Sequence, residues 1–81
     1  MKKQEIIEKI ENIVNYYSVW TIGITSDPAQ RKKIYGNPAS WTQWKADCEK
    51  IARDVEMYFL DKGMNGRTEI GKSPNYVYIF M

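Results

Sequence analysis

The sequence predicts an α+β fold, in which a small, mostly antiparallel sheet of two or three strands is covered by helices. Three observations lead to this prediction. Residues 2–15 and 47–62 repeat apolar side chains at the spacing of amphipathic helices. Residues 16–25 are expected to form a strand, because Trp20, Ile22 and Ile24 alternate with Thr21, Gly23 and Thr25 as in a half-buried strand. The C-terminal run 76–80, Tyr-Val-Tyr-Ile-Phe, is rich in the β-branched and aromatic residues that strands favour.

Length and composition indicate one soluble globular domain, residues 1–81, because 43% of the 81 residues are hydrophobic and 27% are charged. The net charge of +2 is too small to indicate nucleic-acid binding from bulk electrostatics. The single cysteine excludes an internal disulfide, and the absence of histidine excludes imidazole catalysis and the common zinc sites. No apolar run approaches a membrane span and the N-terminus lacks a signal peptide, so we expect a cytoplasmic protein without a membrane partner.

The first helix, residues 2–15, carries mixed charges on its polar side, and we expect it only to pack against the rest of the domain. After the first strand, Ser26-Asp27-Pro28 supplies a cap and a first-turn proline for a short basic helix. The turn Gly36-Asn37-Pro38 ends that helix. Residues 40–46 should be extended or irregular.

The longest helix, residues 47–62, has Asp47 as its expected N-cap and Cys48 in its buried stripe. A glycine-bearing loop then leads to the C-terminal strand. We expect that strand to lie centrally and to pair with the first strand.

Chemistry-bearing side chains gather around the end of the first strand. Arg31 and Tyr35 are four residues apart and therefore share a face of the short helix. A guanidinium offers a planar fork to phosphate oxygens, so Gly23, Thr25, Arg31 and Tyr35 form a candidate phosphate site. An ordinary turn followed by a solvated basic helix face is the alternative, and the pattern alone leaves both open.

The run Thr21-Ile-Gly-Ile-Thr25, with Asp27, Arg31 and Tyr35 after it, resembles the second half of the GIY-YIG nuclease signature. That pattern reads Tyr-x-Gly-x-Thr, then Asn or Asp, then Arg, then His or Tyr four residues later. The segment 52–56, Ala-Arg-Asp-Val-Glu, resembles the glutamate-bearing helix of the family. The resemblance implies that a tyrosine assists attack of water on a phosphodiester and that Arg31 stabilises the developing charge. It also implies that Glu56 holds one Mg²⁺ or Mn²⁺.

The sequence departs from the family at Thr21, which stands where the family has a tyrosine and is a poor acid or base near neutral pH. The strand that carries Gly-Ile-Tyr is also missing, since a helix occupies that region. A rearranged or permuted fold, in which Tyr76 or Tyr78 of the C-terminal strand supplies the equivalent strand, is the candidate replacement. The candidate catalytic residues are Arg31, Tyr35, Thr21 and Tyr78.

These observations predict a degenerate GIY-YIG-like module that binds nucleic acid or a protein partner without efficient catalysis. A metal-dependent endonuclease that cleaves DNA phosphodiesters is the alternative, and only that activity would require Mg²⁺ or Mn²⁺. A homodimer is a third expectation, since a domain this small gains by burying aromatic residues across a two-fold interface. The candidate nucleic-acid-binding residues are Arg31, Lys32, Lys33, Lys45 and Arg67.

Overall fold

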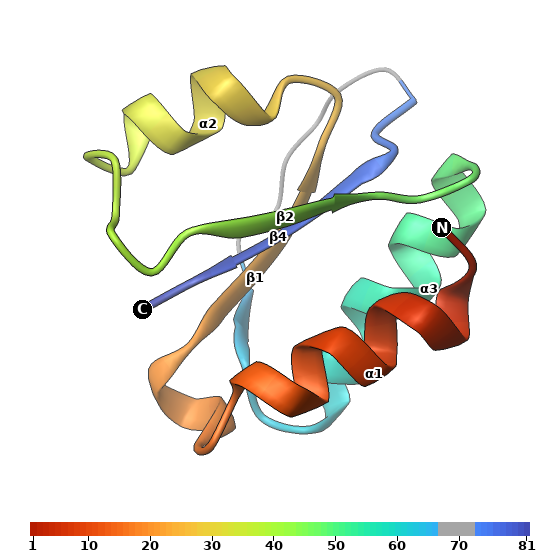
Figure 1. Cartoon of the computed structure of the whole chain (residues 1–81), viewed down its shortest axis with the longest axis horizontal. Coiled ribbons are helices and arrows are strands. Elements are labelled where there is room, and N and C mark those ends of the chain that lie inside the picture. The colour runs from red at the N-terminus through yellow and green to blue at the C-terminus, as the bar shows by residue number, and fades with distance from the viewer. Residues whose placement is uncertain (67–72) are drawn as a thin grey trace.

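The computed structural model describes residues 1–66 and 73–81, and within them the chain has an α+β fold (Figure 1). The described helices are α1 (Lys3–Ile13), α2 (Pro28–Ile34) and α3 (Glu49–Asp61), with a 3₁₀ turn, η1 (Tyr17–Val19). The described strands are β1 (Thr21–Thr25), β2 (Thr42–Lys45), β3 (Asn65–Gly66) and β4 (Tyr76–Phe80). The class predicted from the sequence is therefore confirmed.

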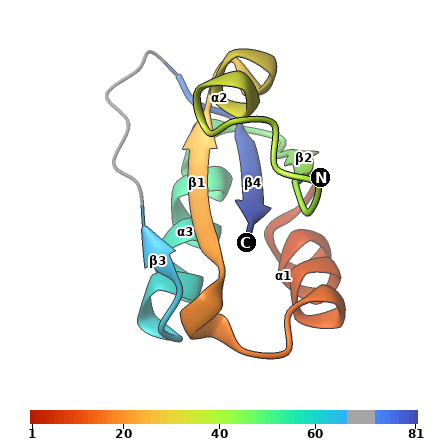
Figure 2. The same cartoon turned by 90° about the vertical axis from the view of Figure 1, so that its left-hand side faces the viewer.

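The four described strands form one mixed sheet in the order β2-β4-β1-β3 (Figure 2). As expected from the sequence, β4 lies centrally and is antiparallel to β1, with Tyr78 opposite Gly23. Strand β2 is antiparallel to β4, while β3 is parallel to β1. The expected two or three strands were too few, because β3 has only two residues and is too short to show any periodicity.

Helices α1 and α3 cover one face of this sheet, and α2 lies across the sheet from them (Figure 1). Alternate residues of a strand point to opposite faces, so Ile22, Ile24, Val77 and Ile79 face the two helices. All four are buried. The helices contribute the apolar stripes that complete this core, namely Ile6, Ile7 and Ile10 from α1 and Ala52, Val55 and Phe59 from α3.

The local signals around α2 are confirmed. The Asp27 carboxylate accepts a hydrogen bond from the Gln30 N–H at 3.2 Å, and Pro28 is the first helical residue. Gly36 has a φ of +79°, the left-handed conformation in which glycine ends a helix. The strand expected over residues 16–25 is correct only in its second half, because η1 occupies residues 17–19.

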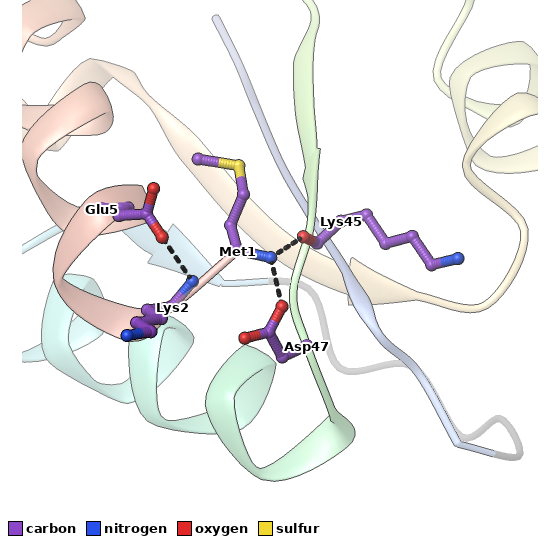
Figure 3. Close-up of polar contacts among 5 residues, drawn as sticks. All are labelled: Met1, Lys2, Glu5, Lys45 and Asp47. Carbon is purple, nitrogen blue, oxygen red and sulfur yellow. Dashed lines mark hydrogen bonds and ion pairs between the residues drawn. The ribbon is translucent and has the colours of Figure 1, made fainter.

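The start of α3 differs from the sequence prediction. Cys48, not Asp47, is the N-cap residue, and Cys48 is exposed rather than buried. The Asp47 carboxylate instead accepts a hydrogen bond at 2.7 Å from the α-amino group of Met1, which also donates to the Lys45 carbonyl at 2.8 Å (Figure 3). The Asp47 carboxylate, which the local pattern predicted would cap α3, therefore bonds a residue far away in the sequence instead.

Phe59 is the position in α3 where truncation should cost most. Its fully buried ring lies 5.9 Å from Tyr17 and 5.0 Å from Tyr58 between centroids. We expect Phe59→Ala to lower the free energy of unfolding by about 3–5 kcal/mol, as for other buried phenylalanines. The exposed Met57, on the same helix, is the control, and Met57→Ala should change it by less than about 0.5 kcal/mol. Urea unfolding followed by circular dichroism measures both, and equal losses would contradict the described core.

Candidate functional site

The face of the sheet away from α1 and α3 carries four stacked rings, Tyr35, Trp41, Tyr78 and Phe80, here called the aromatic cluster. Trp41 lies flat on Tyr78, with centroids 4.4 Å apart and ring planes 12° apart. Trp41 and Phe80 are 5.7 Å apart at 18°, and Tyr35 and Phe80 are 4.9 Å apart at 29°. Such offset, near-parallel rings contribute beyond the area that they bury, so the cluster is a second, smaller packed unit.

Gly23 makes room for this cluster. A Cβ atom added at Gly23 would lie 2.2 Å from the Tyr78 hydroxyl oxygen and 2.4 Å from Cζ of the same ring. The Tyr78 ring therefore crosses directly over the β1 backbone, and only glycine leaves space for it.

The structure brings two of the four candidate catalytic residues together. The Tyr78 hydroxyl donates a hydrogen bond to the Tyr35 hydroxyl across 3.5 Å, which joins β4 to the residue that ends α2. Arg31 also belongs to α2, is half-buried, and has its Nε atom buried. Thr21 shares the sheet face with Gly23, but it lies two residues away, opposite Phe80.

The candidate metal ligand, Glu56, lies on the other side of the sheet. It belongs to α3, which packs against the face opposite Tyr35 and Tyr78. Burial raises the pKa of the Glu56 carboxyl, and the positive charge of Arg53 partly opposes that rise. In the described part of the chain, no three acidic or cysteine side chains gather as a metal site would require.

Charge separates between the two sides of the sheet. Residues 1–15 carry three lysines and three glutamates, and residues 46–62 carry five acidic and three basic residues. The i,i+4 ion pairs Lys50–Asp54 and Arg53–Glu49 lie on α3. In residues 16–45 and 73–81, by contrast, Asp27 is the single acidic residue, against Arg31, Lys32, Lys33 and Lys45. Lys33 and Lys45 are exposed, and Lys32 is half-exposed. The α2 side of the sheet is therefore basic.

Lys45 joins this basic side to the aromatic residues of β4. Its ammonium nitrogen lies 6.0 Å from the ring centroid of Tyr76, its register partner. Figure 3 shows the Lys45 side chain extending away from Asp47 and the start of α1. The last of the candidate nucleic-acid-binding residues, Arg67, lies outside the described residues.

Two residues of the aromatic cluster were missed as site residues by the sequence analysis. Phe80 alternates with Tyr78 in β4, so the strand period alone places both on one face. Trp41 was not among the candidate site residues, because the pairing of β2 with β4 that brings it over Tyr78 is a long-range contact without a local signal.

The described residues enclose no pocket, and none of their helices has the length and apolarity needed to cross a membrane. Comparison with known proteins found no matching family model, no matching curated protein and no matching solved structure.

The close contact between Gly23 and Tyr78 gives a direct test of the site geometry. We expect Gly23→Ala to lower the free energy of unfolding by about 1–3 kcal/mol, because the added methyl group overlaps the Tyr78 ring. Tyr78→Ala removes that ring, so the double variant should lose less stability than the sum of the two single variants. Thermal unfolding of the four proteins measures this coupling, and simple additivity would show that the ring does not lie over Gly23.

Proposed function

We propose that this chain is a GIY-YIG-like module that binds nucleic acid through the face formed by α2, β2 and β4, without efficient catalysis. The observation that supports it best is the separation of charge across the sheet. Lys32, Lys33 and Lys45 lie on the side where Asp27 is the single acidic residue among the described ones. Lysine side chains that neutralise phosphates release counterions, and this supplies most of the affinity in non-specific binding.

The low net charge of +2 is compatible with this proposal, because it is the sum of the charges on two surfaces that differ in charge. The acidic residues in excess lie in and beside α3, and the sheet separates them from α2. A polyanion that approaches the α2 side meets a local positive potential, since exposed charges beyond about 10 Å are largely screened at physiological salt.

Three features favour binding without efficient catalysis. Tyr78 is fully buried and its hydroxyl is directed to Tyr35. Thr21 offers a hydroxyl with no acid–base capacity near pH 7. Glu56 extends from the helix on the opposite face of the sheet, so a metal ion held by it would lie away from Tyr35 and Tyr78.

We expect the double variant Lys32→Ala/Lys33→Ala to bind nucleic acid at least about tenfold more weakly at low salt, and its log K against log salt slope to fall by about 1–2. Fluorescence anisotropy with a labelled oligonucleotide in a salt titration measures both quantities. Lys2→Ala/Lys3→Ala at the start of α1 is the matched control, with the same charge change on the other side of the sheet. Binding that is indifferent to salt and to both variants would instead indicate a protein partner.

A divalent-metal-dependent endonuclease remains the second candidate, favoured by one contact, the meeting of the Tyr78 and Tyr35 hydroxyls over Gly23. Under our proposal, incubation with Mg²⁺ or Mn²⁺ should not cleave branched, duplex or single-stranded DNA above the buffer rate. Cleavage that is lost in Arg31→Ala, Tyr78→Phe and Glu56→Gln alike would establish the nuclease. Cleavage that survives all three would come from a contaminant.

A further inference from the structure

We infer that the nucleic acid bound by this face is single-stranded, and that one of its bases stacks on Trp41. This inference rests on the proposed function and specifies the ligand of the same face. The ring geometry of the aromatic cluster supports it, because phosphate contacts to basic side chains alone would not need such rings.

Trp41 offers a large, flat, partly exposed ring. One face of its indole lies against Tyr78, with the planes only 12° apart, while Tyr78 beneath it is completely buried. The exposed part of the Trp41 side chain therefore excludes the ring face that packs on Tyr78. Phe80 is also half-exposed and lies at 18° to Trp41, but Tyr35 stacks on it at 4.9 Å, so Trp41 is the ring that a ligand can reach.

The indole is held in its orientation before any ligand binds. Its Nε1–H donates a hydrogen bond to the Gln43 side-chain oxygen at 2.9 Å, and its ring contacts Tyr78 and Phe80. Less side-chain freedom remains to be lost on binding, which favours affinity. The pairing of β2 with β4 fixes the backbone on which both rings stand.

Positive charge stands beside these rings. Lys45 is exposed on the same strand and the same face as Gln43, and Lys32 belongs to α2, three residues before Tyr35 of the cluster. A chain of phosphates with exposed bases matches both features, because the phosphates contact lysines while the bases stack on rings. A duplex matches only the basic side chains, since base pairing and stacking keep the faces of its bases inside the helix.

The test compares a fluorescein-labelled oligothymidylate of about 12 nucleotides with a mixed-sequence DNA duplex of equal length, by anisotropy at two salt concentrations. That length covers the usual site size of a small single-strand-binding domain. We expect the single strand to bind at least about tenfold more tightly than the duplex, because stacking adds to the phosphate contacts.

Trp41→Leu should weaken single-strand binding by about 5- to 100-fold, since one stacked base contributes about 1–3 kcal/mol. Its duplex binding should change less than about twofold, as phosphate contacts remain.

Tyr16→Ala is the matched control, because Tyr16 is 74% exposed but belongs to the segment between α1 and η1. It should bind both ligands as the unchanged protein does. A second measurement guards against a folding defect in Trp41→Leu: oligothymidylate should quench tryptophan fluorescence, and the milder Trp41→Phe should remove that quenching although Trp20 and Trp44 remain.

Equal affinity for the two ligands, or quenching that persists in Trp41→Phe, would overturn this inference and leave nucleic-acid binding standing. The absence of binding to either ligand would overturn the proposed function as well.

Discussion

The structure depends on the burial of one strand on both of its faces. Strand β4 lies between β1 and β2, and its residues Val77, Tyr78 and Ile79 are all completely buried. Val77 and Ile79 complete the core under α1 and α3, while Tyr78 lies on the other face over Gly23. A register shift of one residue would exchange these two sets, placing the phenol in the aliphatic core and opening a gap over Gly23. The size of Gly23 and the alternation in β4 therefore fix the same register.

Two unlike surfaces follow from that register. On the aliphatic face, two helices close the sheet, and α3 carries acidic and basic residues in i,i+4 pairs. On the other face, one short helix and a tryptophan cover Tyr78 and leave Phe80 and Tyr76 half-exposed. A sheet covered completely on one face and partly on the other is a rigid support for a binding surface, because its side chains stand on hydrogen-bonded strands.

The sequence was informative where local physics decides the outcome. The apolar stripes of α1 and α3, the Asp27-Pro28 cap, the alternation in β1 and the β-branched and aromatic run of β4 all predicted elements that the structure contains. Local patterns failed where a distant residue supplies the interaction. Asp47 does not cap α3, because its carboxylate accepts a hydrogen bond from the α-amino group of Met1. Strand β3 forms because its two residues pair with β1. The same limit applies to the site. Spacing placed Arg31 and Tyr35 on one helix, but only the tertiary fold puts Glu56 on the other side of the sheet from them.

Packing also bears on the proposal that this surface binds nucleic acid without efficient catalysis. A catalytic phenol needs access to water and to the scissile phosphate, whereas Tyr78 is buried beneath the indole of Trp41 and bonded to Tyr35. Trp41 packs flat against Tyr78. In the proposed function this contact orients the indole for a base, and it also shields the Tyr78 phenol from water and substrate. An endonuclease built on this face would have to displace Trp41 and lose the stacking surface. The geometry of the aromatic cluster therefore favours recognition of a nucleic acid over its cleavage.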